Sequence, residues 1–430
     1  MSTSAFSHLM RSVPAAPKIE LRSFDGVARS ESRATDPTLT CQARNAVAAN
    51  DAFSFWKLAE EWQPALNEII LESARIAEHY LFENYLAACR RRPPSGLDTY
   101  YLVKNLIPDK IRFSINSLAI RVRRRQTFPN WPCEGTLLRL WRQWLQRALR
   151  QVGATDGWHI GFWPRGFRSC IVITHDVESS LGLDAMNAVA DLEERYGFRS
   201  AWNLPLQQYA IDWKQVDNLR ERGFEFGAHG LRHDGKLFRS AADFAALKPK
   251  LEKLAREHGL HGFRAPSTLR RAEWIASMTF DFDSSFADTD PWEPQPGGTC
   301  SIFPFFLSSQ MVELPYTLPQ DHTLIHLLHR DPLQVWMLKA DWIASVGGLI
   351  LTLTHPDYSG SGRYLQKYED LLKHLAAIEG AWRALPSEVA RWWRNRAALT
   401  LRVGDSGIRI EGAQAGEAVA VALSKEPLAN

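Results

Sequence analysis

The stretch IVITHDVE, residues 171–178, decides the fold of this chain. Its apolar and β-branched residues end in two carboxylates, and a helical pattern starts at Leu181, as expected for a buried parallel strand followed by a helix. Because alternate side chains of a strand share a face, Asp176 and Glu178 point the same way and Val177 points away. The stretch therefore predicts a site at this strand end. The alternative, at even odds, is that both acids decorate a solvated loop or cap the helix.

The composition limits the class of protein. Of 430 residues, 45% are hydrophobic and 23% charged, and 51 Lys and Arg against 48 Asp and Glu leave a net charge of +3. This balance is ordinary for globular proteins and argues against a general nucleic-acid binder. Five scattered cysteines without a CxxC pair favour a reducing compartment. No stretch reads as a leader or a membrane helix, so we expect a soluble, cytoplasmic protein, unless a leader has been lost.

Four regions follow from the changes in pattern along the chain. Residues 1–50 lack apolar periodicity and predict a flexible arm, whereas residues 51–155 predict a helical extension. The basic run Arg121–Arg125 in this extension is more often a solvated helix face than a contact for phosphate or lipid headgroups. Residues 156–397 alternate strands and helices, and residues 398–430 predict a small antiparallel sheet formed by residues 398–403 and 418–423.

Repeated strand–helix units predict an α/β fold with parallel strands, either a (β/α) barrel or an open doubly wound sheet. No phosphate-binding GxGxxG or Walker pattern follows any strand, which disfavours a nucleotide-binding fold. An insertion over residues 288–319 is rich in Pro, Gly and aromatic residues. A long loop at the active end of a parallel fold usually faces substrate, so we expect this one to do so.

Two histidines follow a second predicted strand. In the run GAHGLRHD, residues 227–234, a helical turn would place His229 and His233 on one face, where both imidazoles reach one metal ion. A carboxylate would complete a facial triad. Such a pair is more often incidental, but its place at a strand end parallel to the Asp176 strand favours metal ligands.

Three further strand ends carry residues capable of chemistry. Arg264 in GFRAP, residues 262–266, would keep Asp176 ionised through a charge-assisted hydrogen bond, although an ordinary surface ion pair is the alternative. Asp283 lies in the run FDFDSS, residues 280–285. His355 follows a run of Leu, Ile and Thr and could act as a general acid, although a lone histidine there is more often a loop residue.

Together and in this order, the five features resemble the polysaccharide deacetylase superfamily, the NodB-homology domain of carbohydrate esterase family 4, over about residues 167–380. The family's Thr-Phe-Asp-Asp run is similar to residues 174–177, its His-(Ser/Thr)-x-x-His to residues 229–233 and its Arg-x-Pro to residues 264–266. Its Asp-containing groove motif resembles residues 283–285, and its Leu-x-Leu-x-His resembles residues 351–355. The resemblance implies a distorted, seven-stranded (β/α) barrel and metal-dependent deacetylation.

Two positions depart from the family pattern. Val177 replaces the family's metal-binding second Asp, and Gly230 replaces the Ser or Thr after the first histidine. Because Glu178 shares a strand face with Asp176, we assign Glu178 as the carboxylate ligand beside His229 and His233. The expected ion is Zn²⁺, with Co²⁺, Ni²⁺ or Mn²⁺ as alternatives.

The resemblance implies hydrolysis of an acetyl group, most often an N-acetyl on an amino sugar. Asp176 would act as the base, positioned by Arg264, and His355 as the acid, with Asp283 as its partner and a backbone N–H near residues 283–286 in the oxyanion site. The expected partner is an acetylated glycan or a lipid- or nucleotide-linked precursor, met in the cytoplasm or at the inner membrane face, where Arg121–Arg125 could contact phosphate.

Two other functions stay open. The first is a catalytically inactive glycan-binding protein on the same barrel, suggested by Val177 and by a supply of aromatic residues in the insertion: Trp292, Phe303, Phe305 and Phe306. The second is a glycosidase that uses Asp176 and Glu178 as its acid pair. Neighbours two apart on one strand leave little room for a sugar, which disfavours this second function.

Overall fold

The computed structural model describes residues 50–86, 128–293, 295–359, 362–405 and 407–423. The chain divides into residues 1–37 and 38–430, so every described residue belongs to the second unit. Residues 1–49 of the predicted arm and the basic run Arg121–Arg125 lie outside the described residues. Among the described helices, none combines the length and the apolar character needed to cross a bilayer.

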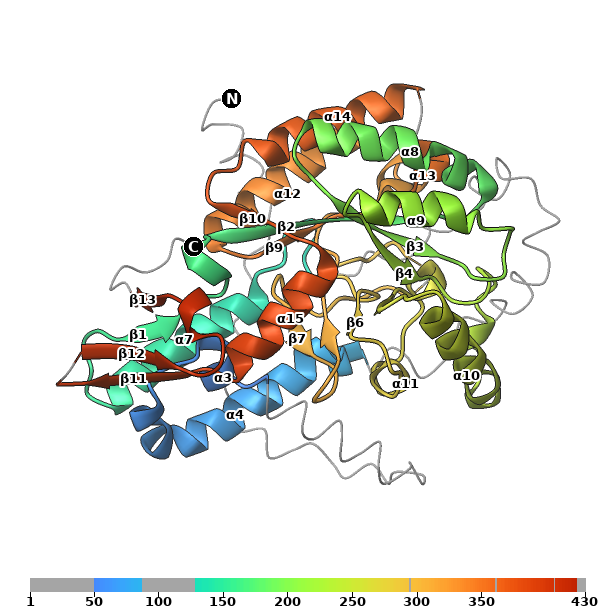
Figure 1. Ribbon diagram of the computed structural model, residues 1–430. Coiled ribbons are helices and arrows are strands. Elements are labelled where there is room, and N and C mark those ends of the chain that lie inside the picture. Colours follow the sequence, from blue (N-terminus) through green and yellow to red (C-terminus); the bar gives the residue numbers. More distant parts are fainter. Residues whose placement is uncertain (1–49, 87–127, 294, 360–361, 406, 424–430) are drawn as a thin grey trace. The chain divides into compact units, whose positions relative to one another are not determined.

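A nine-stranded sheet forms the centre of this unit (Figure 1). Its order is β10-β2-β3-β4-β5-β6-β8-β7, and β9 also pairs with β2. All neighbouring strands are parallel except β7 and β8, which are antiparallel. The strands are β2 (Ser169–Asp176), β3 (Ser200–Leu204), β4 (Glu225–Ala228), β5 (Gly262–Phe263), β6 (Phe282–Asp283), β7 (Phe305–Phe306), β8 (Val312–Glu313), β9 (Leu349–Leu351) and β10 (Ala381–Arg383).

The mixed α/β fold is confirmed, but the sheet has nine strands where we expected seven. The insertion supplies β7 and β8, and β10 pairs with the first half of β2 while β3 pairs with the second half. The sheet curls, so that the segment after β8 meets β9, although β8 and β9 are far apart in the strand order. The backbone N–H groups of Thr317 and Leu318, just beyond β8, both donate to the carbonyl of Leu351 on β9 (3.1 and 3.0 Å). The ends of the parallel strands thereby face a common centre.

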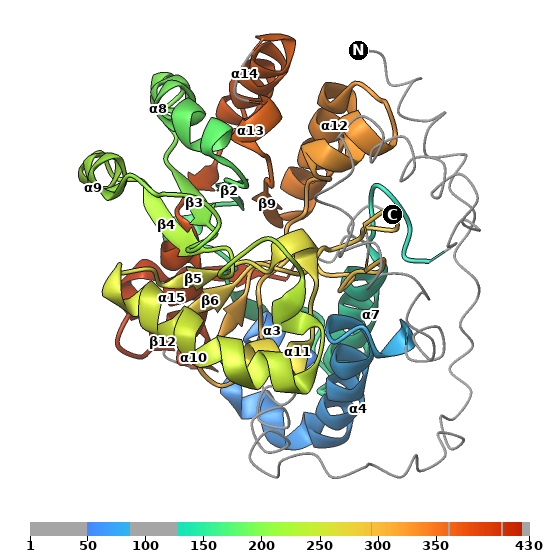
Figure 2. The same ribbon diagram turned by 90° about the vertical axis from the view of Figure 1, so that its right-hand side faces the viewer.

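Helices α8, α9 and α10 lie outside the curve of β2 to β6 (Figure 2). Several begin at a side-chain cap, as at Ser240, whose hydroxyl accepts the N–H of Asp243 at 3.1 Å. The helices of this region are α8 (Ser180–Arg195), α9 (Trp213–Glu221), α10 (Ala241–Glu257), α11 (Ala272–Ala276), α12 (Pro332–Val346), α13 (Pro356–Ser359), α14 (Gly362–Ala376) and α15 (Pro386–Ala397). The 3-10 turns are η1 (Glu60–Trp62), η2 (Asn84–Leu86), η4 (Pro164–Gly166), η5 (Lys236–Phe238), η6 (Pro266–Thr268) and η8 (Ala415–Glu417), and η7 (His322–Leu327) is a π-helix.

The N-terminal helices α3 (Ala52–Trp56), α4 (Gln63–Leu81) and α7 (Thr136–Gln151) share one apolar core with the curled sheet. Indole N–H groups tie them together: Trp56 Nε1 donates to the carbonyl of Trp141 at 3.1 Å, and Trp144 Nε1 to that of Ile69 at 2.8 Å. The extension therefore packs as part of the same core.

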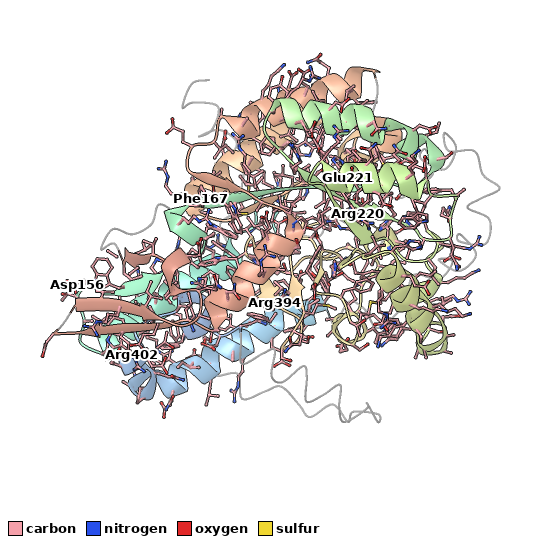
Figure 3. The ribbon with its side chains drawn as sticks, in the orientation of Figure 1. Asp156, Phe167, Arg220, Glu221, Arg394 and Arg402 are labelled. Carbon is pink, nitrogen blue, oxygen red and sulfur yellow. The ribbon has the colours of Figure 1, made fainter. Side chains whose placement is uncertain are left out.

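The C-terminal strands differ from the small sheet that we expected. β11 (Thr400–Gly404) pairs with β12 (Gly407–Glu411), whereas β13 (Ala420–Ala422) pairs antiparallel with β1 (Trp158–Ile160), far upstream in the sequence. Arg402 on β11 is labelled in Figure 3. Its Nε lies 3.5 Å from Glu411 Oε2 on β12, and its Nη1 lies 3.6 Å from Glu61 Oε1 of the extension. Sequence patterns locate strands of this kind but do not identify their partners.

Three phenylalanines of the insertion pack inward, whereas its Trp292 is partly exposed. Phe303, Phe305 and Phe306 are all buried in the core. The Asn50 side chain donates to the carbonyl of Phe306 and accepts its N–H, both at 2.8 Å, so it pairs with this strand as a backbone would. The expectation that the loop faces substrate is therefore wrong for these three phenylalanines, of which Phe303 lies against Phe55 on α3 with ring centroids 5.2 Å apart.

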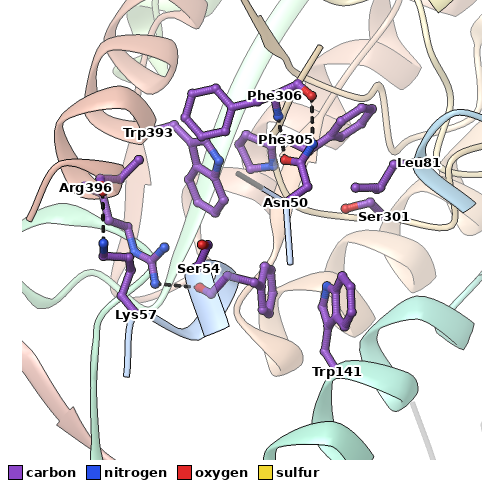
Figure 4. A pocket seen from close by; sticks show the side chains of 13 residues that line it. Asn50, Ser54, Lys57, Leu81, Trp141, Ser301, Phe305, Phe306, Trp393 and Arg396 are labelled. Carbon is purple, nitrogen blue, oxygen red and sulfur yellow. Dashed lines mark hydrogen bonds between the residues drawn. The ribbon is translucent and has the colours of Figure 1, made fainter. Parts of the chain in front are cut away.

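A cavity of about 110 Å³ lies where α3, β7 and the end of α15 meet (Figure 4). Its cationic lining is Lys57 and Arg396, and the Arg396 guanidinium donates to the backbone carbonyls of Phe55, Ile160 and Gly161 at 2.8–2.9 Å. The cationic group thus holds backbone segments together. Within the described part of the chain, the lining includes none of the predicted site residues.

Candidate metal centre

The two carboxylates of the opening stretch lie at the carboxyl end of β2. Asp176 is the last residue of the strand and is buried, and Glu178 follows two residues later with its side chain 32% exposed. Both face the histidines: His229 Nε2 lies 3.9 Å from Asp176 Oδ2, and His233 Nε2 lies 2.9 Å from Glu178 Oε1. His175 turns to the other side, where its Nε2 lies 2.6 Å from Glu193 Oε1. Strand alternation accounts for the opposite directions of His175 and Asp176, and Glu178 reaches the same site from just beyond the end of β2.

The two histidines follow β4, but not on a helix as we expected. Residues 229 and 230 have no regular structure and residues 231–235 form bends, and the ring centroids of His229 and His233 are 5.3 Å apart. Gly230 has a φ of +74°, and a Cβ there would lie 2.8 Å from Pro266 Cγ. Only glycine combines this backbone conformation with so close an approach, which accounts for Gly230 at the position where the family has Ser or Thr.

Glu178, His229 and His233 can hold one metal ion, because one ligand atom from each lies within 4.8 Å of the others. His229 Nδ1 lies 3.0 Å from the carbonyl of Arg264 and donates to it, which leaves Nε2 with its lone pair toward the site. That buried Nε2 has no hydrogen-bond partner among the described residues. An orphaned imidazole nitrogen facing a carboxylate and a second imidazole is the donor set that zinc prefers.

The electrostatics favour ligation. Burial lowers the pKa of His229 to about 4, so its imidazole is neutral near neutral pH. Burial alone would raise the pKa of Glu178, but the adjacent His233 and His355 hold it well below its usual value. Both groups are therefore in the protonation state that a metal ion requires.

Asp176 is held by Asn203 rather than by a direct hydrogen bond from Arg264. Asn203 Nδ2 donates to Asp176 Oδ1 at 2.9 Å, whereas Arg264 Nη1 lies 3.6 Å from the same oxygen, too far for a hydrogen bond. The buried guanidinium donates instead to Thr174 Oγ1 (3.0 Å) and Ser284 Oγ (2.7 Å). Burial would raise the pKa of Asp176, but the charge of Arg264, then His229, holds it below its usual value.

His355 lies on the loop after β9, and its partner is Asp321 rather than Asp283. Its Nδ1 is 2.7 Å from Asp321 Oδ1, its backbone N–H donates to Asp321 Oδ2 at 2.8 Å, and its Nε2 is 3.6 Å from Glu178 Oε1. Burial alone would lower the pKa of His355, but Asp321, together with Glu178 and Asp176, raises it to about 10. His355 is thus an imidazolium at the edge of the metal centre.

Asp283 is buried in a separate network. It accepts from the hydroxyl and the N–H of Ser285 (2.6 and 3.2 Å) and lies opposite Glu313 on β8. Burial raises its pKa. The N–H groups of Ser284, Ser285 and Phe286 all donate to protein acceptors. The expectation that one of these N–H groups binds an oxyanion therefore fails as well, because Phe263 on β5, Asp283 on β6 and Glu313 on β8 accept them.

Sequence reasoning missed three residues of the site: Asn203, Asp321 and Asp357. Asn203 lies in register with Asp176 on the adjacent β3, a pairing that strand order would have revealed. Asp321 is the N-cap of η7 and Asp357 lies in α13, and the meeting of these two segments depends on the curl of the sheet. Asp357 accepts the N–H of Glu178 at 3.0 Å.

Comparisons with known proteins give matches at the level of structure. No model of a known family matches the chain, and no curated protein matches it. A structure described as a polysaccharide deacetylase of Mycobacterium smegmatis is 16% identical over 54% of this chain and 92% of its own, with a TM-score of 0.46. An allantoinase is 14% identical over 54% and 92%, with a TM-score of 0.44. A family 4 carbohydrate esterase from Streptomyces lividans, solved with acetate, is 12% identical over 51% and 93%, with a TM-score of 0.34. Polysaccharide deacetylases and family 4 esterases, which the motifs resemble, are thus among the structural matches.

Proposed function

We propose that this protein is a metal-dependent hydrolase that removes an acetyl group, an N-acetyl on an amino sugar. One observation carries the proposal: a two-histidine, one-carboxylate ligand set lies between a buried ionised carboxylate, Asp176, and a buried imidazolium, His355. Acyl hydrolysis needs a base for water and an acid for the leaving group at one electrophilic centre, and this arrangement supplies both.

Glu178, His229 and His233 would hold the ion. A divalent ion bound there supplies Lewis acidity, which lowers the pKa of water and polarises an acyl carbonyl. The carbonyl of Arg264 fixes the ring of His229 through its Nδ1 at 3.0 Å, so the chain presents Nε2 to the site in one tautomer.

Asp176 is the base in this proposal. It is ionised, it is buried, and its Oδ1 is held by Asn203, which leaves Oδ2 on the side of His229. Asp176 would take one proton from the water that attacks the acyl carbon. Arg264 acts on Asp176 through its charge at 3.6 Å and stabilises the ionised form.

His355 is the acid. Its Nδ1 is held by Asp321, so Nε2 is the nitrogen that faces the site and would give its proton to the departing amine. The amine then leaves as the acetyl group is released as acetate. An acid and a base with pKa values pushed apart by their surroundings are typical of active sites.

The substrate in this proposal is an acetylated glycan or a lipid- or nucleotide-linked precursor, met in the cytoplasm or at the inner membrane face. The glycan-binding alternative loses support from the structure, because the phenylalanines of the insertion are buried. Glu178 also supplies the carboxylate that Val177 does not.

The test begins with the metal content of the purified protein by elemental analysis. We expect about one ion per chain in the wild type and in Asp176→Asn, and its loss in Glu178→Ala and His233→Ala. His258→Ala, which removes a histidine stacked on Trp213, is the matched control and keeps the ion. Acetate release from N-acetylated amino-sugar oligomers should disappear in Asp176→Asn. Absence of metal from the wild type, or unchanged turnover in Asp176→Asn, would contradict the proposal.

A further inference from the structure

The segment that carries the carboxylate ligand lies just beyond the end of β2. Its backbone is held from three sides: the N–H of Asp176 donates to the carbonyl of Thr354 (3.0 Å), the N–H of Val177 to that of Asn203 (3.1 Å), and the Tyr209 hydroxyl donates to the carbonyl of Val177 (2.6 Å). These contacts end one residue before Glu178. A further anchor is therefore needed to set the direction in which the Glu178 side chain leaves the backbone.

Asp357 supplies this anchor. Its Oδ2 accepts the N–H of Glu178 at 3.0 Å, and its Oδ1 accepts the hydroxyl of Ser179. Asp357 lies in α13, two residues after His355. One carboxylate thus ties the loop that carries the metal ligand to the loop that carries the acid.

The sequence makes room for this contact. Gly182, in the first turn of α8, lies against Asp357, and a Cβ at this position would be 2.4 Å from Asp357 Oδ2. Any larger residue would push the carboxylate or the helix away. Gly182 therefore permits the close approach of α13 to α8.

We infer that Asp357 is a positioning residue, which aims the carboxylate of Glu178 at the metal by fixing its backbone N–H. The inference rests on the proposed function. A glutamate ligand has one more rotatable bond than an aspartate and here lies outside the strand, so its backbone needs external support. Partners that orient a metal ligand change metal affinity by about 10- to 100-fold when they are removed.

Two substitutions at Asp357 distinguish its positioning of the Glu178 backbone from an effect of its negative charge. Asp357→Ala removes both contacts, and we expect its zinc affinity to fall by about 10- to 100-fold. Asp357→Asn has the same shape and can still accept the N–H of Glu178 while its amide faces Ser179, so it should keep an affinity within a few-fold of wild type. Asp331→Ala is the control: it removes an exposed N-cap aspartate that accepts the N–H of Leu333 at 3.0 Å at the start of α12, away from the site.

The measurement is the dissociation constant for Zn²⁺ by competition with a chromophoric chelator, with the Co²⁺ absorption spectrum as a readout of ligand geometry. Gly182→Ala displaces the Asp357 carboxylate by another route and should also weaken zinc binding. This variant replaces Asp357→Ala in the test if Asp357→Ala does not fold. Wild-type affinity in Asp357→Ala overturns the inference alone. Equal losses of zinc affinity in Asp357→Asn and Asp357→Ala overturn it too, because the charge of Asp357 would then be responsible. The same loss in Asp331→Ala also overturns it, because a general loss of stability would then explain the effect. A wild type that binds no metal removes the proposed function and this inference together.

Discussion

Replacing Asp321 by Asn tests how the protein sets the protonation of His355. Both oxygens of this fully buried carboxylate serve His355: Oδ1 lies 2.7 Å from the ring Nδ1, and Oδ2 accepts the backbone N–H at 2.8 Å. Asparagine preserves the shape but removes the charge, and its single oxygen cannot accept both protons.

The expected fall in the pKa of His355 follows from the charged hydrogen bond that Asp321→Asn removes. A hydrogen bond to a charged group contributes about 1.5–3 kcal/mol, and about 1.4 kcal/mol corresponds to one pKa unit. The pKa of His355, raised to about 10 in the metal-free wild type, should therefore fall by about 1 to 2 in Asp321→Asn. Glu178 and Asp176 still lie nearby, so the pKa should stay above the ordinary value of 6.5.

The assay is an NMR titration of chelator-treated protein labelled at histidine, with His355→Gln to identify the resonance. Stability gives a second readout. A histidine whose pKa is raised in the folded state stabilises the fold fully below the unfolded pKa, 6.5, and this contribution is lost as the pH rises toward about 10. The difference in unfolding free energy between wild type and Asp321→Asn should therefore shrink between these values. An unchanged pKa of His355 would refute the role of Asp321.

Three further predictions concern the scaffold. Burial raises the pKa of Glu225 to about 7 from 4.5. The wild type should therefore lose up to about 3 kcal/mol of unfolding free energy relative to Glu225→Gln as the pH rises from 4.5 through 7, measured by urea unfolding. Parallel curves of unfolding free energy against pH for the two proteins would contradict this. Arg270→Met should cost about 3–5 kcal/mol in the same assay, because it removes the guanidinium that faces the buried Glu83 carboxylate, and adding Glu83→Gln should recover part of the loss. Gly262→Ala should destabilise by about 1–3 kcal/mol, since its Cβ would lie 2.0 Å from Phe282 Cζ; a melting temperature equal to that of the wild type would argue against the packing on β5.

The features predicted from the sequence have short-range causes. Asp176 ends β2 and Glu178 follows it by two residues toward the same site, and position at a strand end brings His229, His233, Arg264 and His355 to the same edge. These follow from the two-residue period of a strand and from parallel strand direction. Both are local properties that a single sequence carries.

The expectations that failed concern which side chains and segments contact each other in the fold. Asp283 stood in a plausible motif, yet its carboxylate is engaged by Ser285 and lies opposite Glu313, while His355 takes Asp321 from a loop 34 residues upstream. The phenylalanines of the insertion turn inward, where Phe303 lies against Phe55 and Phe305 against Phe82 of the N-terminal extension. Which strand neighbours which, and which loops therefore meet, depends on packing between segments far apart in the chain.

The sequence by itself thus determined the fold class, the metal ligands that we propose and the strand ends that carry the chemistry. Only the tertiary structure decided the support around them: Asn203 on Asp176, Asp321 on His355 and Asp357 on the backbone of Glu178. The physical reason is the separation along the chain of the residues that interact. Periodicity and strand ends are set by neighbours along the chain, whereas a hydrogen-bond partner is set by the curl of the sheet, which brings β3 and the loop after β9 against the end of β2.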